Sequence, residues 1–386
     1  MKQYMDRILE LLNSGMTKAD IARQLISENN LTTNQDTMRI YVSRAVSRHN
    51  NQGVKDACDD IQVAPSNVPY LWLKTKQASL FIKNPAYRVD EIDYESIISK
   101  CLDGKLPVPK GDWKPGKTVD RLVWTDVHVG MDASRKGLAL YAADWNESEL
   151  IKRVKEMAEF VLANKSSDSL VIDDLGDFMD GWDGETTRKG HKLPQNMTNE
   201  EAFESGLKAK VLLIDYLAPQ YKNIMCNNIC EDNHSGAFGY IVNSAFKHVV
   251  DRKYSNVHVV NHKRFINHYI IGKHGFIISH GKDSRNLKFG FKVQLDPRSV
   301  EKISQYIRHA QDIRSCEYVE FSKGDSHQML FDYSSSDEFD YFNFPAFSPS
   351  SEWVQTNFKK GRSGFVFFQI DLNSNRKVVM PYFFNS

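Results

Sequence analysis

The sequence predicts an α/β domain over residues 119–386, preceded by a small all-α domain at residues 1–50 and a connector at residues 51–118. Apolar side chains recur at helical spacing in the first 50 residues, which is typical of short packed helices. From about residue 119, short apolar runs alternate with longer amphipathic segments, which indicates the alternating strands and helices of an α/β fold. The proline-rich segment KLPVPKGDWKPGK separates the two regions. At 386 residues, the chain is also long enough for more than one domain.

Three short helices are predicted in the N-terminal domain. The first ends at Gly15, the second opens at Thr17 with Asp20 three residues later, and the third starts at Thr33. The segment TKADIARQL, followed by a turn and a basic third helix, resembles the helix-turn-helix of phage and bacterial regulators. This resemblance implies that the third helix enters the major groove of DNA. The candidate DNA contacts are Arg39, Arg44 and Arg48. The alternative is a helical cap or protein-binding module whose arginines are only solvated.

The connector contains two segments with a regular pattern. YLWLKTKQASLFIK alternates enough to predict a hairpin or two short strands, and VDEIDYESIISKCL reads as one amphipathic helix.

The α/β domain is predicted from strands that end in polar clusters. Strands are expected at RLVWTD, SLVIDDLGD, KNIMCNNIC, VHVVNH, FINHYIIG and GFIISHG, and a hairpin from GFVFFQIDL and KVVMPYFF closes the chain. Helices are expected at residues 146–164, from Thr198 with Glu201 three residues later, and at residues 298–312. Ligand sites in open α/β sheets lie beyond the carboxyl ends of strands, so these clusters can converge.

Composition excludes some protein classes. The net charge of +1 gives no global field toward nucleic acid or membranes, and no apolar run reaches the roughly 20 residues of a bilayer span. The N-terminus lacks the features of a signal peptide, and five scattered cysteines suggest reduced thiols. We therefore expect a cytoplasmic protein of a bacterial or phage-infected cell. We expect Cys226 and Cys230 to be buried in a strand rather than to form a zinc or redox site.

Five short polar clusters carry residues that ligate metals: TDVHVG, LGDFMD, EDNHSG, SHGKD and KGDSHQ. The candidate metal ligands are Asp126, His128, Asp177, Asn233, His280, Asp325 and His327, with His234 as an eighth position of interest. Hard oxygens and imidazoles in this number suit two divalent ions held side by side. A two-metal centre indicates hydrolysis or transfer at a phosphorus or carbonyl centre.

The ordered clusters closely resemble the calcineurin-like metallophosphoesterase superfamily, whose pattern is D-x-H, G-D-x-x-D, G-N-H-[DE], a lone H and G-H-x-H. The resemblance covers residues 119–386 through these motifs and implies a four-layer α-β-β-α sandwich. It implies that Asp126, His128 and His327 hold a first ion, and that Asp177 bridges both ions. Asn233 and His280 would hold the second ion. The family's chemistry is attack on phosphorus by a hydroxide that both ions activate, with no covalent intermediate, and His234 would stabilise phosphoryl oxygens or protonate the leaving group.

This sequence departs from the family pattern at three positions. Asp232 replaces the usual Gly, and Ser235 replaces the usual Asp or Glu, which leaves the orientation of His234 open. Asp325 replaces a histidine ligand of the second ion. A carboxylate there makes the site harder and more anionic, which favours Mn²⁺ or Mg²⁺ over zinc, with Fe also possible in this family, or else it weakens the second site.

Two segments suggest the substrate. The loop GWDGETTRKGHK supplies Arg188, Lys189 and His191 beside the second motif, and KDSRNLKFGFK supplies Lys282 and Arg285 interleaved with Phe289 and Phe291. Basic groups next to aromatic rings suit a single strand of nucleic acid, although an ordinary amphipathic strand would look the same. The D-x-H-V-G motif also resembles that of the DNA-repair exonuclease branch.

The first hypothesis is therefore a two-metal phosphodiesterase, a DNA nuclease of phage or mobile-element type with manganese as the favoured ion. The second is a phosphatase or phosphodiesterase that acts on a small nucleotide or a phosphoprotein. The third is a DNA-binding regulator with a non-catalytic metal domain.

Overall fold

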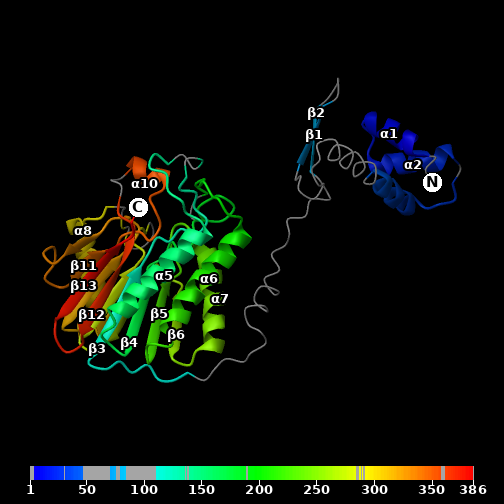
Figure 1. The fold of residues 1–386 in the computed structure, drawn as a ribbon. Helices are drawn as coiled ribbons and strands as arrows, with labels where there is room; N and C mark the ends of the chain where they lie inside the picture. The colour runs from blue at the N-terminus through cyan, green and yellow to red at the C-terminus, as the bar shows by residue number, and fades with distance from the viewer. Residues whose placement is uncertain are drawn as a thin grey trace. The chain divides into compact units, whose positions relative to one another are not determined.

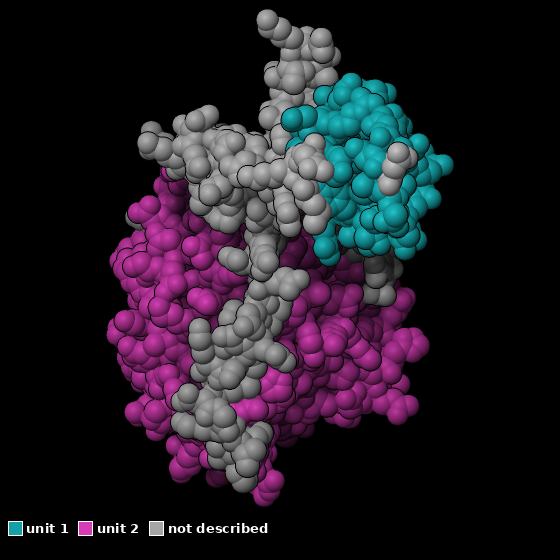
Figure 2. All heavy atoms as spheres, turned by 90° about the vertical axis from the view of Figure 1, so that its right-hand side faces the viewer, with its two compact units in different colours: residues 1–93 teal, residues 94–386 magenta. Residues whose placement is uncertain are grey.

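The structure is a computed structural model that describes residues 4–29, 31–46, 70–74, 79–83, 110–134, 136, 139–187, 190–283, 287, 289, 292–357 and 361–385. The chain divides into two compact units, residues 1–93 and residues 94–386 (Figure 2).

The first unit begins with the three predicted helices. They are α1 (Met5–Asn13), α2 (Lys18–Glu28) and a third helix at residues 35–46. The three helices share one core, which consists of Ile8, Leu11, Ile21, Ala22, Leu25, Met38, Val42, Ala45 and Val46. The prediction of a three-helix unit is therefore confirmed.

The sequence also identified where these helices start. The side chain of Thr17 accepts a hydrogen bond from the Asp20 backbone N–H and so caps α2. The third helix begins at residue 35, two residues after the predicted start at Thr33, because Asn34 takes the capping position and accepts from the Thr37 backbone N–H at 2.8 Å.

The connector contains the predicted hairpin. Strands β1 (Tyr70–Lys74) and β2 (Ser79–Lys83) pair antiparallel, with Tyr70 opposite Lys83. The helix predicted at VDEIDYESIISKCL lies outside the described residues.

Two sheets form the centre of the second unit. The six-stranded sheet has the order β13-β12-β3-β4-β5-β6, and the five-stranded sheet has the order β10-β11-β9-β8-β7. The bounds in the first sheet are β3 (Thr118–Trp124), β4 (Ser169–Asp174), β5 (Asn223–Ile229), β6 (Val257–His262), β12 (Gly364–Asp371) and β13 (Lys377–Phe383). Those in the second are β7 (Ile266–Ile271), β8 (His274–Ser279), β9 (Tyr318–Lys323), β10 (Leu330–Asp332) and β11 (Asp340–Asn343). Strands β3 to β6 are mutually parallel, and β8, β9 and β11 are parallel in the second sheet.

Apolar side chains on both faces of each sheet stack the unit into layers. In β3, Leu122 and Trp124 contact the helical side, whereas Val119 and Val123 face the second sheet. In β8, Phe276 faces the first sheet and Ile277 contacts the outer helices. The result is the predicted four-layer α-β-β-α sandwich, with α5, α6 and α7 covering one side (Figure 1).

The helices agree with prediction in part. Their bounds are α5 (Glu147–Ala163), α6 (Asn199–Leu217), α7 (Gly236–Lys253), α8 (Pro297–His309), α9 (Gln311–Arg314) and α10 (Glu352–Asn357). The predicted capping box of α6, Thr198 with Glu201, is present. The helix expected at residues 298–312 instead ends at His309, because Ala310 is extended, and a short α9 follows. Among the described helices, none is long and apolar enough to cross a bilayer.

A buried ion network joins the two sheets. The Arg121 guanidinium on β3 donates to Asp173 Oδ2 on β4 at 2.7 Å, and across the sheet interface to Glu320 and Ser322 on β9. The Arg121 side chain is fully buried and lies over the ring of Phe276. Because a buried charge without a partner is costly, this network fixes the pairing of the two sheets at one point.

Candidate metal centre

The five predicted clusters follow five parallel strands. Asp126, Asp177 and Asn233 come after β3, β4 and β5 in the first sheet, while His280 and Asp325 come after β8 and β9 in the second. Since the carboxyl ends of parallel strands share an edge, the loops of the two sheets meet, and the side chains converge.

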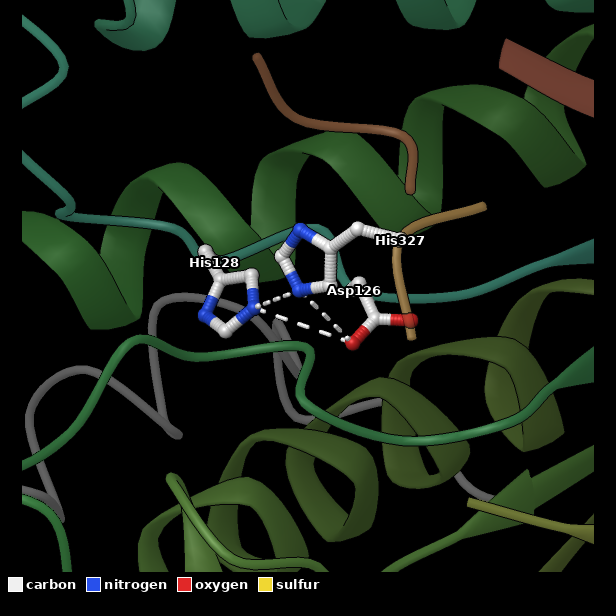
Figure 3. Close-up of side chains that lie close together, drawn as sticks. All are labelled: Asp126, His128 and His327. Carbon is white, nitrogen blue, oxygen red and sulfur yellow. Dashed lines mark hydrogen bonds and ion pairs between the residues drawn. The ribbon is translucent and has the colours of Figure 1, made fainter. Parts of the chain in front are cut away.

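Three ligand atoms form the first set (Figure 3). Asp126 Oδ1 lies 3.3 Å from His327 Nε2 and 3.8 Å from His128 Nε2. The two imidazole nitrogens lie 3.3 Å from each other. Two imidazole nitrogens and a carboxylate oxygen that face one another need a proton or a cation between them.

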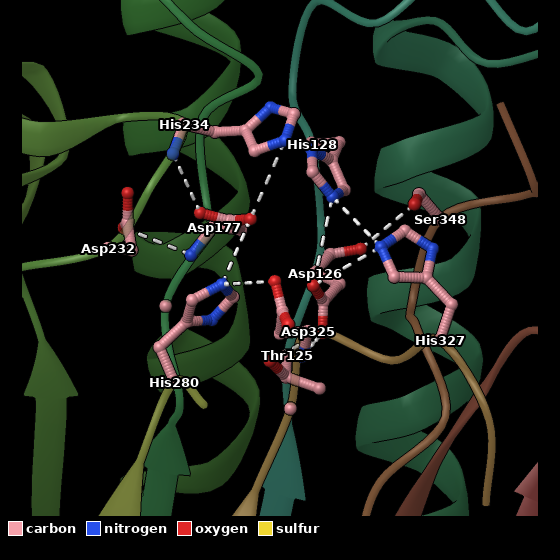
Figure 4. Close-up of polar contacts among 12 residues, drawn as sticks. Thr125, Asp126, His128, Asp177, Asp232, His234, His280, Asp325, His327 and Ser348 are labelled. Carbon is pink, nitrogen blue, oxygen red and sulfur yellow. Dashed lines mark hydrogen bonds and ion pairs between the residues drawn. The ribbon is translucent and has the colours of Figure 1, made fainter. Parts of the chain in front are cut away.

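A second set surrounds His280 (Figure 4). The Nε2 atom of His280 lies 3.0 Å from Asp177 Oδ2, 3.1 Å from Asn233 Oδ1 and 3.6 Å from Asp325 Oδ1. Asp126, Asp177 and His280 also bring ligand atoms within 4.8 Å of one another, so the two sets adjoin. The arrangement suits two cations that share carboxylates.

The backbone of both sets is strained. Among the described residues, six non-glycine residues have a positive φ, and five of them are predicted ligands. The five are Asp126 (53°), His128 (47°), Asp177 (48°), Asp325 (65°) and His327 (53°). Left-handed backbone at such residues costs on the order of 1–3 kcal/mol each and concentrates at functional sites. The strain supports a role for these loops beyond connecting strands.

Neighbouring groups fix how the ligands point. Asp180 Oδ1 accepts from His128 Nδ1 at 3.0 Å, and the Leu175 carbonyl accepts from His280 Nδ1 at 3.1 Å. Both imidazoles therefore carry a proton on Nδ1 and turn Nε2 toward the centre. Asp180 is the last residue of GDFMD, three residues after Asp177, and was not among the predicted ligands; its carboxylate holds His128 in place.

Buried charges set the protonation of the metal-free centre. Burial lowers the pKa of His128, but the neighbouring carboxylates of Asp126 and Asp180 outweigh it and raise that pKa to about 10. Burial opposes charging of His280 too, yet the Asp177 carboxylate raises its pKa well above the usual value. The imidazoles, His327 foremost, keep the pKa of Asp126 well below its usual range despite burial. At neutral pH the metal-free centre therefore pairs imidazolium with carboxylate, and a cation would displace these protons.

The donor set fits divalent metal ions. Within the described part of the chain, Asp325 Oδ2 and His327 Nδ1 are buried without a hydrogen-bond partner, and Asp126 Oδ1 accepts no hydrogen bond. Asp126 Oδ2, in contrast, accepts from Thr125 Oγ1 at 2.8 Å and from the Asp325 backbone N–H at 3.0 Å. One carboxylate oxygen is thus anchored while the other faces the two imidazoles.

The departure at Asp232 has a structural reason. Its Oδ2 accepts from the Asp177 backbone N–H at 3.0 Å, and its Oδ1 accepts from the backbone N–H groups of Ser235 and Gly236. Asp232 therefore ties the Asp177 loop to the start of α7. Burial, followed by the Asp177 charge, raises the pKa of Asp232 to about 6.

His234 lies beside both sets. Its Nδ1 donates to the Asp180 carbonyl at 2.9 Å, and its Nε2 lies 3.9 Å from Asp177 Oδ2. This hydrogen bond fixes the orientation of the ring that the sequence left open. Burial lowers the pKa of His234, but Asp177 outweighs it and the pKa is raised.

The fold and the order of the candidate ligands are those that the resemblance to the calcineurin-like metallophosphoesterases implies. A scan against protein-family models finds no match, and a comparison with curated proteins finds none. Among solved structures, the chain is similar to a predicted phosphoesterase from Streptococcus pneumoniae, at 9% identity and a TM-score of 0.27, over 69% of this chain and 98% of that one. It is also similar to a 5′-nucleotidase from Candida albicans, at 12% identity and a TM-score of 0.28, over 72% of this chain and 53% of that one. The third similar structure is a calcineurin-like phosphoesterase from Bacillus subtilis, at 8% identity and a TM-score of 0.25, over 69% of this chain and 91% of that one. At these TM-scores, the metallophosphoesterase function has to be inferred from the site itself.

The weaker site predictions have mixed outcomes. Arg48, Arg188, Lys189 and Arg285 lie outside the described residues. Arg39 and Arg44 are exposed on the helix at residues 35–46. His191 is exposed and pairs with Thr186 through two hydrogen bonds, while Lys282 is half-buried two residues after His280.

Phe289 and the two cysteines near β5 are buried. Of the two interpretations of KDSRNLKFGFK, base stacking by Phe289 is wrong, because Phe289 is buried against Phe321 in the outer core. Cys226 and Cys230 are buried as expected, burial raises the pKa of each thiol to about 12, and among the described residues neither belongs to a group of side chains that could hold a metal ion.

Proposed function

We propose that this chain is a metal-dependent phosphoesterase that hydrolyses phosphodiester bonds, with DNA as the substrate. The observation that carries the proposal is the convergence of two ligand sets, from five strand ends, around shared carboxylates. Asp126, His128 and His327 would hold one ion, Asn233, His280 and Asp325 the other, and Asp177 both. Bound divalent ions supply charge neutralisation for the phosphoryl group and a water acidified to hydroxide near neutral pH.

His234 would act on the phosphoryl group itself. The Asp180 carbonyl holds its Nδ1, so the proton on Nε2 is the one available for donation. The Asp177 carboxylate outweighs burial and raises the pKa of His234, which favours the protonated ring. His234 would therefore stabilise phosphoryl oxygens or protonate the leaving oxygen.

The manganese preference rests on Asp325. With a carboxylate in place of the family's histidine, the second set has three oxygen donors, from Asp177, Asn233 and Asp325, and one nitrogen donor, from His280. Such a set favours a hard ion, Mn²⁺ or Mg²⁺, over zinc.

The DNA assignment is supported by the N-terminal unit. Arg39 and Arg44 are exposed on its third helix, the one that the helix-turn-helix resemblance places in the major groove. In the full-length protein, replacing both with Ala should weaken duplex binding. It should also make the affinity less dependent on salt, by about one unit of slope for each phosphate that an arginine neutralises. Unchanged binding would leave the arginines as solvated groups.

A substrate panel tests the activity. Purified protein with Mn²⁺ is given single- and double-stranded DNA, RNA, bis-p-nitrophenyl phosphate and p-nitrophenyl phosphate. We expect cleavage of the diester and of DNA, abolished in Asp177→Asn and retained in the surface variant Asp215→Asn. Turnover of the monoester alone would favour a phosphatase, and tight DNA binding without turnover would favour a regulator.

A further inference from the structure

We propose that the pocket beside His234 binds the nucleoside portion of the substrate, a role that rests on the proposed function and specifies its substrate class. The pocket has a volume of about 630 Å³, which is within the usual range for small-ligand sites. It is lined by Trp182, Glu185, Thr186, Thr187, Phe238 and Ile241, together with Gly190 and Ala237. Residues proposed as metal ligands do not line it.

Both walls of the pocket start at the metal centre. Trp182 follows Asp180 by two residues, and Ala237 follows His234 by three. Thr187 donates from its backbone N–H and from Oγ1 to the His234 carbonyl, at 3.1 and 3.0 Å. One wall of the pocket is therefore held against the backbone of the histidine that is proposed to act on the phosphoryl group.

The loop that forms one wall is a small hairpin. Trp182 and Glu185 exchange backbone hydrogen bonds at 2.9 and 3.0 Å across the turn at Asp183 and Gly184. Both turn residues have positive φ, 51° and 74°, as a tight type I′ turn requires. The wall is thus built before any ligand arrives, which lowers the ordering cost of binding.

A glycine allows the two walls to close on each other. A Cβ at Gly236 would lie 2.4 Å from Thr187 Oγ1, so only glycine lets Thr187 reach the His234 carbonyl. Its φ of 47° also disfavours other residues.

The chemistry of the lining selects a flat, neutral group. The half-buried Trp182 ring packs edge to face on the buried Phe238 ring at 4.9 Å and is the ring available for stacking, and Ile241 adds apolar surface that is 38% exposed. Aromatic side chains of this kind stack on nucleobases regardless of sequence. The Glu185 carboxylate disfavours a phosphate in the pocket but can accept hydrogen bonds from an exocyclic amine. The phosphoryl group would thus lie at the metal centre and the attached nucleoside in the pocket.

Two esters with the same leaving group test the assignment. Thymidine 5′-p-nitrophenyl phosphate and methyl p-nitrophenyl phosphate differ only in the nucleoside. We expect the wild type to prefer the thymidine ester by about tenfold or more in kcat/KM, a gain typical of one stacked base. Ile241→Glu and Trp182→Ala should remove that preference mainly through KM and leave the methyl ester within about twofold.

Ile270→Glu is the matched control, because Ile270 is 39% exposed on β7 and does not line the pocket. Equal turnover of both esters by the wild type, or an equal loss of both in the pocket variants, would overturn the nucleoside assignment. If neither ester is hydrolysed, the proposed function fails. In that case adenosine binding tests the pocket separately. Adenosine should quench the tryptophan fluorescence of the wild type and not that of Trp182→Phe. No quenching in either protein refutes the nucleoside assignment.

Discussion

Replacing Asp180 should weaken the first metal site without removing a ligand. Its carboxylate is buried and accepts from His128 Nδ1 at 3.0 Å. Hydrogen bonds to charged groups contribute about 1.5–3 kcal/mol. Loss of such a partner behind a metal-bound histidine costs about 10–100-fold in affinity, which is about 1.4–2.7 kcal/mol. Because the two estimates agree, we expect Asp180→Ala to weaken one of two Mn²⁺ binding events by about 100-fold, and Asp180→Asn, whose amide oxygen still accepts, by about tenfold.

Calorimetric titration of the metal-free, full-length protein measures this loss. The backbone carbonyl of Asp180 still accepts from His234 Nδ1 in both variants, so the second histidine keeps its place. The control is Asp183→Asn, since Asp183 pairs with Asn199 on the surface and asparagine tolerates its left-handed backbone. A change of less than about threefold in Asp180→Ala, which is under about 1 kcal/mol, would refute the supporting role of Asp180.

Three further outcomes are expected. Arg121→Met should lower the free energy of unfolding by about 3–5 kcal/mol, because it leaves Asp173 buried without its cation and leaves Glu320 with Lys377 alone. Urea denaturation measures this loss, and a loss below about 1 kcal/mol contradicts the prediction. Metal binding at neutral pH should release protons, and the metal affinity should rise as pH rises toward the pKa of about 10 that His128 has in the metal-free protein. Calorimetry in buffers of different ionisation enthalpy counts the released protons. A binding enthalpy that does not depend on the buffer would be evidence against proton release. Gly324→Ala should reduce the amount of bound metal, because its Cβ would lie 2.2 Å from Thr125 Oγ1. Gly111→Ala is the control, because a Cβ there meets open space. Equal metal content of the two variants by mass spectrometry would contradict the expected effect of Gly324→Ala.

The sequence predicts an α/β domain and the convergence of the ligands because both follow from local patterns, whereas the four-layer sandwich was implied by the resemblance to the calcineurin-like metallophosphoesterases. Alternating apolar runs identify the strands, and the parallel arrangement brings their polar ends to one edge. Asp126, Asp177 and His280 could therefore be placed together although they are far apart in the chain. The proposed nuclease activity could not be predicted in the same way. It rests on exposed side chains such as Arg39, which packing does not constrain.

The elements that sequence analysis missed depend on tertiary contacts. Helix α7 starts with Gly236 and contains Gly239, both of which lower helix propensity. A Cβ at Gly239 would lie 2.9 Å from the Cβ of Ser235, so the fold requires glycine where propensity disfavours a helix. Strand β9 was also missed, because its buried positions include the charged Glu320 and Lys323, whose partners come from distant strands.

Neither ligand set belongs to one sheet. The first needs Asp126 and His128 after β3 of one sheet and His327 after β9 of the other, and the second likewise combines residues from both sheets. During synthesis, therefore, a nascent chain could complete neither set until β9 and the GDSH loop had left the ribosome. A fragment of the chain that ends before β9 would lack both complete sets. Metal loading would thus be a late event that reports on whether the two sheets have assembled.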